Sequence, residues 1–166
     1  MTLRTLVLVR HSKASHDAPS DIDRPLTKRG REMAEALAQE LAHRVGSLDL
    51  LLVSPAARAS QTAAPLAAHL APEETRVEPA IYETGPGGVL DLINTVPETA
   101  SAVAVVGHEP TISSLARLLH DADDAQAAEI SFGVPTATAV VIEVSSTWAQ
   151  LQIGSARIRE VFTTRR

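Results

Sequence analysis

Three short runs of the sequence, residues 5–9, 49–53 and 102–106, are apolar almost throughout. A run in which apolar and polar residues do not alternate predicts a strand that is buried on both faces. Apolar residues at helical spacing lie between these runs, so strands and helices alternate along the chain. This order predicts an α/β fold, a three-layer α/β/α arrangement around a mostly parallel central sheet.

The first two helices have recognisable ends. The first is expected from Thr27 onward and ends at Gly46, a residue that favours helix termination. The second is expected to begin at Ser54 as N-cap with Pro55 in the first helical position. Pro65 lies inside its pattern and is expected to kink or break it. The apolar face of the first helix consists of Met33, Ala34, Leu37, Ala38, Leu41, Ala42 and Val45.

The remaining elements are predicted from shorter patterns. Residues 76–79 suggest a short strand and 86–96 a short helix, and a further helix is expected from about Thr111. Residues 136–144 are apolar enough for another strand. Apolar and polar side chains alternate over residues 148–153, which predicts a half-exposed strand.

The size and composition of the chain exclude several classes of protein. Its 166 residues contain no long Pro/Gly/Ser linker, so one domain over residues 1–166 is expected. The chain has no cysteine, which excludes a disulfide scaffold, a thiolate nucleophile and a thiolate metal site. The formal net charge of −5 argues against a surface for nucleic acid or for an anionic membrane.

The apolar run near the N-terminus is short. Charged residues end this run after a few positions, so the run is too short for the apolar region of a signal peptide. No stretch of the sequence reaches the ~18 apolar residues of a membrane-spanning helix. A cytoplasmic protein that binds neither membrane nor nucleic acid is therefore expected.

Polar residues of one kind follow the buried runs. Arg10 and His11 follow the first, Arg58 lies one turn into the helix after the second, and His108 follows residues 102–106. Ligands of parallel α/β sheets collect at the carboxyl ends of the strands, so these four side chains are expected to meet there. Arginines grip phosphate oxygens bidentately, a neutral imidazole can attack phosphorus, and an imidazolium can stabilise the equatorial oxygens. The pattern predicts chemistry on a phosphoryl group.

Four motifs, in order, give the chain a family resemblance. The sequence resembles the histidine phosphatase superfamily, which includes the phosphoglycerate mutase-like proteins, and within it the compact SixA-type phosphohistidine phosphatases. The resemblance spans roughly residues 5–144. Its motifs are Leu8-Val9-Arg10-His11, the segment Asp23-Arg24-Pro25-Leu26-Thr27-Lys28-Arg29-Gly30, the segment Ser54-Pro55-Ala56-Ala57-Arg58-Ala59-Ser60-Gln61-Thr62, and Val106-Gly107-His108. The resemblance implies a phosphoglycerate mutase-like fold.

The resemblance also implies roles for individual residues. His11 would be the nucleophile that becomes phosphohistidine, and Arg10, Arg58 and His108 would form the phosphate pocket. Glu83 stands where many members of the superfamily carry the proton donor. A phosphate ester leaves as an alkoxide and benefits from a general acid, whereas a phosphohistidine leaves as imidazole and needs one less. Glu83 therefore bears on the choice of substrate.

Basic residues crowd the first turn of the first helix, where the helix dipole disfavours them. They are either a solvated face neutralised by Asp21 and Asp23, or a basic rim that attracts a phosphorylated substrate. Arg24 and Lys28 are the best candidates for substrate binding. His16 and the acids around it match no metal-ligand spacing, so no metal is expected, and the phosphatase chemistry requires no organic cofactor.

Protein phosphohistidine is the substrate that these observations favour. Two alternatives remain open: a small-molecule phosphomonoester phosphatase, whose substrate would be a phosphorylated metabolite, and a non-catalytic phosphate-binding module. The second would keep Arg10 and Arg58 but would tolerate the loss of His11.

Overall fold

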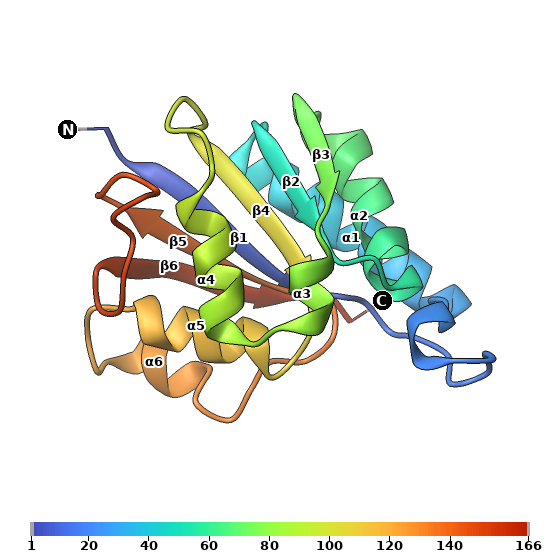
Figure 1. Ribbon diagram of the computed structural model, residues 1–166. Helices are drawn as coiled ribbons and strands as arrows, with labels where there is room; N and C mark the ends of the chain where they lie inside the picture. The colour runs from blue at the N-terminus through green and yellow to red at the C-terminus, as the bar shows by residue number, and fades with distance from the viewer. Residues whose placement is uncertain (1, 166) are drawn as a thin grey trace.

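The computed structural model describes residues 2–165 and contains a six-stranded sheet with helices on both faces (Figure 1). The strand order is β3-β2-β4-β1-β5-β6, and β5 pairs antiparallel with both of its neighbours, while β3, β2, β4 and β1 are parallel. The elements are β1 Arg4–Arg10, η1 Asp21–Asp23, α1 Lys28–Val45, β2 Leu50–Val53, α2 Ala57–Leu70, β3 Glu74–Val77, α3 Pro79–Glu83, α4 Pro86–Asn94, β4 Ala102–Gly107, α5 Thr111–Leu119, α6 Ala125–Glu129, β5 Thr138–Val144 and β6 Ala156–Thr163. The predicted three-layer α/β/α fold with a mostly parallel sheet is confirmed.

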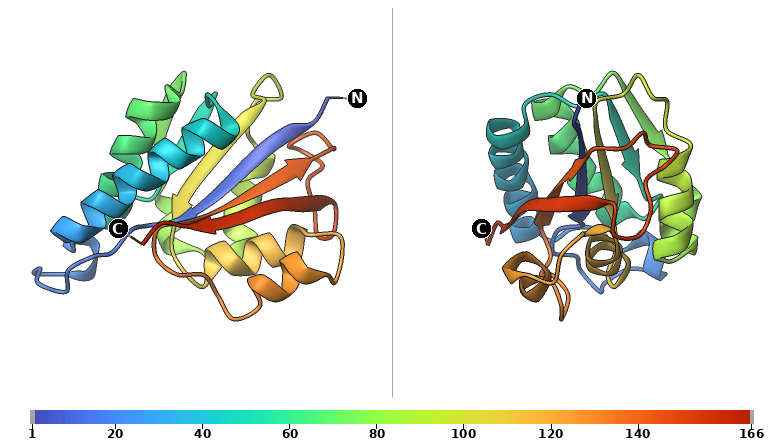
Figure 2. Two further views of the ribbon diagram at one scale, coloured as in Figure 1. Left: turned by 180° about the vertical axis from the view of Figure 1, so that it is seen from behind. Right: turned by 90° about the vertical axis from the view of Figure 1, so that its left-hand side faces the viewer.

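Two separate apolar cores lie on the two faces of the sheet. Side chains of β1 alternate between them: Leu6 and Leu8 belong to the core under α4 and α5, and Val7 and Val9 to the core under α1 and α2. Figure 2 shows these two helical layers on opposite faces of the sheet. Because both faces are covered, β1, β2 and β4 have no polar face, which is why their sequences show no alternation.

The register of the parallel strands brings their carboxyl ends to one edge. Arg10 at the end of β1 pairs with Gly107 at the end of β4, and Val53 at the end of β2 pairs with Val106. The two strands stay in contact for one more residue, because the amide of His11 donates to the carbonyl of Gly107 at 3.0 Å. The polar residues that follow these strands are therefore neighbours.

The first helix forms as predicted. The Thr27 side chain caps it by accepting from the amide of Gly30, and Gly46 ends it with φ of 84°. Gly30 also has a steric role, because a Cβ at this position would lie 2.0 Å from the carbonyl oxygen of Lys13. The glycine thus allows the loop after β1 to lie directly on α1.

The predicted start of the second helix was wrong by two residues. Helix α2 begins at Ala57, because the Ser54 hydroxyl accepts from the Ala56 amide in a turn and also contacts His108, instead of capping a helix. Pro65 does not break α2, which continues to Leu70. Proline removes only one backbone hydrogen bond of the helix, and the apolar packing of α1 on α2 stabilises the rest.

The C-terminal region departs most from prediction. Residues 148–153 form turns instead of a strand: Trp148 is fully buried and donates from Nε1 to the Ala100 carbonyl, while Ile153 is 69% exposed. Trp148, expected on the polar face, is buried and Ile153, expected on the apolar face, is exposed, whereas Leu151 is buried as expected. The last strand is β6, which was not predicted, and neither was α6. The short strand predicted over residues 76–79 corresponds to β3, which begins two residues earlier and ends at Val77. Pro79 begins α3 instead of ending the strand.

Candidate active site

A cavity of about 480 Å³ lies at the carboxyl ends of β1 and β4. It unites the four residues that the sequence singled out from separate segments: Arg10, His11, Arg58 and His108. The complete lining is Arg10, His11, Lys13, Ala14, His16, Arg24, Arg58, His108, Glu109 and Thr136. Arginine, lysine and histidine dominate this lining, so the cavity suits an anion.

His11 presents one ring nitrogen for chemistry and uses the other for orientation. Its Nδ1 lies 2.7 Å from the carbonyl oxygen of Ser12. A carbonyl only accepts hydrogen bonds, so Nδ1 carries the proton and Nε2 carries the lone pair. The pKa of His11 is lowered to about 3, mainly by burial and also by the neighbouring His108, Arg58 and Arg10, against a partial rise from the hydrogen bond to the Ser12 carbonyl. The imidazole is consequently neutral near pH 7, the form that can act as a nucleophile.

His108 lies beside His11, with the two ring centroids 5.3 Å apart. Its Nε2 is 2.7 Å from the Ser54 hydroxyl, which fixes the ring. Burial, followed by the charges of Arg58 and Arg10, lowers the pKa of His108 to about 4. His108 is therefore neutral near pH 7 and is not the imidazolium expected from the sequence. A bound phosphoryl dianion would favour the protonated form by Coulomb attraction.

Three buried nitrogens in the site lack partners. Among residues 2–165, Nε of Arg10, Nε of Arg58 and Nδ1 of His108 are buried without any hydrogen bond. Buried polar atoms in folded proteins are nearly always paired, so three unpaired nitrogens gathered in one cavity favour a ligand at this place. Two guanidinium N–H groups and an imidazole nitrogen match the oxygens of a phosphoryl group.

Asp21 in η1 holds Arg58 in place, a role that the sequence did not reveal. Arg58 donates to the Asp21 carbonyl at 2.7 Å and to its Oδ2 at 3.0 Å. The same Oδ2 accepts from the Tyr82 hydroxyl at 2.7 Å. These hydrogen bonds, that of Tyr82 first, lower the pKa of the Asp21 carboxyl well below its usual range. From sequence, Asp21 was expected only to neutralise basic residues at the surface.

The loop after β1 is secured by a second network. The Ser12 amide donates to the Thr62 hydroxyl at 2.9 Å, and the Ser12 hydroxyl donates to the Gly30 carbonyl at 2.7 Å. The Thr62 hydroxyl in turn donates to the Arg58 carbonyl at 2.7 Å. Helix α2 thus fixes the carbonyl of Ser12 that orients His11.

The three remaining predicted site residues differ in position. Arg24 lines the cavity and donates to the Ser15 carbonyl and to Asp21. Lys28 is exposed at the start of α1 and does not line the cavity. Glu83 is exposed at the end of α3 and does not line it either, whereas the ring of its neighbour Tyr82 packs edge-on against His108 at 5.6 Å. The roles of Arg24, Lys28 and Glu83 stay predictions.

Sequence reasoning missed Lys13, His16 and Glu109 as lining residues. Lys13 and Glu109 each lie within two residues of a predicted site histidine, and this proximity was the available signal. Glu109 accepts from the amide and hydroxyl of Ser113 and from the amide of Val134. Its carboxylate is therefore already engaged.

Within the described part of the chain, no three His, Asp or Glu residues are grouped to hold a metal ion.

No helix among residues 2–165 has the length and apolarity needed to cross a membrane.

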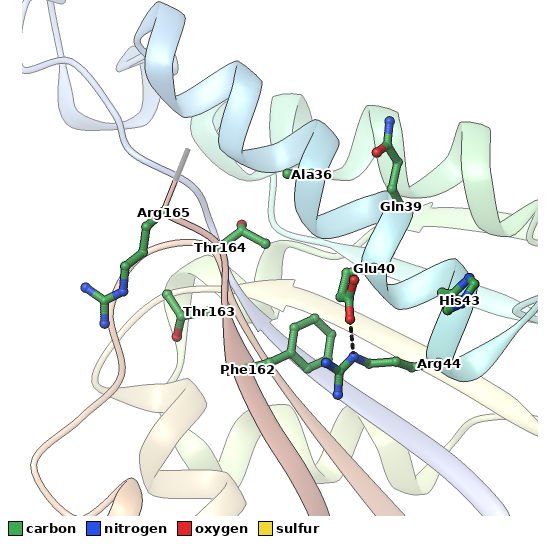
Figure 3. Close-up of a pocket in the computed structure, with 9 residues that line it drawn as sticks. All are labelled: Ala36, Gln39, Glu40, His43, Arg44, Phe162, Thr163, Thr164 and Arg165. Atoms are coloured by element: carbon green, nitrogen blue, oxygen red, sulfur yellow. Dashed lines mark hydrogen bonds and ion pairs between the residues drawn. The ribbon is translucent and has the colours of Figure 1, made fainter.

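A different hollow of about 680 Å³ lies between α1 and the end of β6 (Figure 3). There Arg44 donates to Glu40 at 2.7 Å and to Glu160 at 3.1 Å, and its guanidinium lies 4.4 Å from the ring centre of Phe162. Two carboxylates already pair with this arginine, and His43 is the single histidine in the lining. The smaller cavity gathers three arginines and three histidines and therefore suits a phosphoryl group better.

Comparisons with known proteins agree with this assignment. A model of the histidine phosphatase superfamily, branch 1, matches residues 6–98. The uncharacterized protein Rv1276c of Mycobacterium tuberculosis strain H37Rv is 36% identical over 154 residues, 90% of this chain and 96% of that protein. The phosphohistidine phosphatase SixA of Escherichia coli strain K12 is 32% identical over 111 residues, 65% of this chain and 69% of SixA. The structure of a candidate SixA from Nakamurella multipartitia, 30% identical, superposes with a TM-score of 0.91 over 100% of this chain and 99% of that one.

Proposed function

The chain belongs to the histidine phosphatase superfamily, branch 1, and from this membership we propose that it hydrolyses phosphohistidine on proteins through a phosphorylated His11. It is a phosphatase with a histidine nucleophile. The similarity to phosphohistidine phosphatase SixA supports the finer assignment of substrate.

The observation that carries the choice of phosphohistidine is the state of the carboxylates near His11. Glu109 accepts three hydrogen bonds, and Asp21 is bound by Arg58 and Tyr82. Glu83 is exposed and outside the cavity lining. A phosphate ester needs a general acid for its alkoxide, whereas a phosphohistidine whose other ring nitrogen is protonated leaves as neutral imidazole. The site suits the leaving group that needs no acid.

In the first step, Nε2 of His11 attacks phosphorus in line with the phosphorus–nitrogen bond of the substrate. That bond breaks and its electron pair goes to the departing imidazole of the substrate. Positive charge develops on the His11 ring and is stabilised by the hydrogen bond from Nδ1 to the Ser12 carbonyl. The burial that keeps His11 neutral before attack makes its lone pair available.

In the second step, water attacks the phosphoryl group and His11 departs as neutral imidazole. Arg10, Arg58 and His108 hold the phosphoryl oxygens throughout, and the buried nitrogens of these three residues that lack partners within the protein support this role. Two guanidinium groups supply the charge stabilisation that Mg²⁺ provides in many phosphoryl-transfer enzymes.

A second candidate function is hydrolysis of small phosphate esters. The favouring observation is that Tyr82, whose ring packs against His108, directly precedes Glu83. For this function we infer that the Glu83 carboxyl turns towards the cavity and serves as the proton donor. Arg24 at the cavity rim, and Lys28 if its long side chain reaches over, would then attract the phosphorylated metabolite.

Phosphate release from wild type and from His11→Ala tests the enzymatic function. We expect release with wild type and essentially none with the variant, and acid quenching should trap labelled phosphate on the wild-type protein only. Equal, near-zero release from both would instead identify a non-catalytic phosphate-binding module. Competing rates on a phosphohistidine peptide and on a sugar phosphate decide the substrate: a higher kcat/KM on the sugar phosphate would reject the phosphohistidine assignment.

A further inference from the structure

A second groove adjoins the active-site cavity and shares Arg10 and Glu109 with it. Its volume is about 720 Å³, and it lies between the start of α5 and the loop 131–135. Its lining is Arg10, Glu109, Pro110, Ser113, Ser114, Ser131, Phe132, Gly133, Val134 and Pro135. Because the two hollows share residues, a substrate held by Arg10 in the first can extend into the second.

The side chain at the edge of this groove is unusual. Phe132 is one of only two phenylalanines in the chain, and its relative exposure is 102%, the highest among the large apolar residues described. An aromatic ring removes a large apolar area from water when it is covered, so complete exposure forgoes a substantial stabilisation. In a chain with so few aromatics, this ring is a candidate contact for a partner.

The loop that carries Phe132 is fastened to the catalytic residues. The Val134 amide donates to Oε2 of Glu109 at 2.9 Å, and Nη1 of Arg10 donates to the Val134 carbonyl at 2.8 Å. Gly133 turns the chain with φ of 99°, and a Cβ there would lie 3.0 Å from the same Glu109 oxygen. The position of Phe132 is thereby fixed relative to an arginine of the phosphate pocket.

Apart from Arg10, which the proposed function assigns to the phosphoryl group, the groove offers no free charge to its occupant. The Glu109 carboxylate takes two bonds from Ser113 as well as that from Val134, and Arg10 is bonded to the Val134 carbonyl. What remains is neutral: serine hydroxyls, proline rings and Phe132. A second phosphate or an acidic group would gain little here, in contrast with the cavity side that carries Lys13, His16 and Arg24.

We propose that the groove and Phe132 form a docking surface for the polypeptide segment next to the phosphohistidine, with an apolar side chain of that segment packed on Phe132. This inference rests on the proposed function. The phosphoryl group occupies the cavity between Arg10 and Arg58, and the flanking residues of the same substrate follow the groove. Phe132 is then a specificity-determining residue that acts on protein substrates and lies beyond the reach of a single phosphohistidine.

The test compares two peptides with free phosphohistidine. Both peptides carry one phosphohistidine, with either leucine or aspartate at the neighbouring positions. For Phe132→Ala we expect the ratio of kcat/KM on the leucine peptide to kcat/KM on free phosphohistidine to fall about five- to tenfold, mainly through KM. Wild type should prefer the leucine peptide. Ile153→Ala, which removes another exposed apolar side chain far along the chain, is the matched control and should leave the ratio unchanged.

Three results would overturn the docking surface. One is an unchanged ratio in Phe132→Ala while wild type cleaves the leucine peptide, which leaves the proposed function intact. Another is a loss explained by a change from dimer to monomer in size-exclusion chromatography, which would make Phe132 a contact between copies of the chain. The third is a wild type that cleaves sugar phosphates but neither peptide nor free phosphohistidine, which rejects the proposed function as well.

Discussion

The imidazole rings of His11 and His108 lie 5.3 Å apart between centroids, and both are buried against the positive charges of Arg10 and Arg58. Burial disfavours protonation of both rings most, and the charges of Arg58 and Arg10 add to this effect; for His11 the neighbouring His108 does so too. The site therefore combines two neutral rings with two cations, an arrangement that attracts an anion and leaves Nε2 of His11 unprotonated.

The protonation state of His11 can be observed directly. We expect the ¹⁵N spectrum of the His11 ring to report the Nδ1–H tautomer, with Nε2 unprotonated, at every pH above about 4, since its pKa is about 3. An unfolded histidine titrates near 6.5. NMR titration of the ring nitrogens is the measurement. A midpoint near pH 6.5 for the His11 ring, or a proton on Nε2 at pH 7, would contradict the assignment.

The same buried histidine makes the protein sensitive to acid. In the folded state His11 takes a proton only near pH 3, whereas in the unfolded state it takes one near 6.5. The unfolded state thus binds more protons between these values, and the free energy of unfolding decreases as pH falls through this window. From pH 6.5 to 5 the contribution of His11 is at most about 2 kcal/mol. In urea denaturation, His11→Asn should lose less stability than wild type over this interval, and identical losses would rule the effect out.

Asp21 is expected to act as a positioning residue through Arg58. Asp21→Ala removes the carboxylate that holds Nη2 of Arg58, and we expect kcat/KM to fall about 10- to 100-fold, as for loss of a charged hydrogen bond. Asp21→Asn keeps an acceptor oxygen and should recover part of the activity. Tyr82→Phe, which removes only the second bond to the same oxygen, should cost less. Steady-state kinetics on folded variants is the measurement, and equal activity of Asp21→Ala and wild type would remove this role.

Gly30 and Gly87 form a matched pair for the close approach of the loop after β1. A Cβ at Gly30 would lie 2.0 Å from the Lys13 carbonyl oxygen, whereas nothing lies within 4 Å of a Cβ at Gly87 in α4. Gly30→Ala should destabilise the protein by roughly 1–3 kcal/mol and lower its activity, because the loop next to His11 must shift. Gly87→Ala should be neutral or stabilise by up to about 1 kcal/mol. Thermal unfolding of both variants checks this, and equal melting temperatures would exclude the steric role.

Glu83 separates the two candidate substrates. If phosphohistidine is the substrate, Glu83→Gln should keep its kcat/KM within about twofold, because the departing imidazole needs no external acid. Loss of a general acid in ester hydrolysis would cost about 100-fold or more. Parallel assays of the variant on a phosphohistidine peptide and a phosphate ester provide the comparison. A large loss on both substrates would show that Glu83 serves the site in some other way.

The patterns that predicted elements correctly are those that fit only one secondary structure and one way of burying the apolar side chains. The apolar runs that became β1, β2 and β4 can only be buried on both faces, and the apolar stripe of α1 fits only a helix. The alternation over residues 148–153 had two solutions. Burial of the Trp148 ring, with its N–H bonded to the Ala100 carbonyl, favoured turns, and the strand formed at β6 instead.

The sequence predicted which polar residues would gather at the strand ends: Arg10 ends β1, and His11 and His108 follow β1 and β4, so these residues meet once the two strands pair in parallel. Tertiary structure decided the rest. Asp21 reaches Arg58 across 37 positions of sequence, and Glu83 and Lys28 stand outside the cavity that Lys13 and His16 line. The pKa of His11 also depends on burial. Contacts between distant segments and the desolvation of side chains arise only when the chain is packed, so no local pattern encodes them.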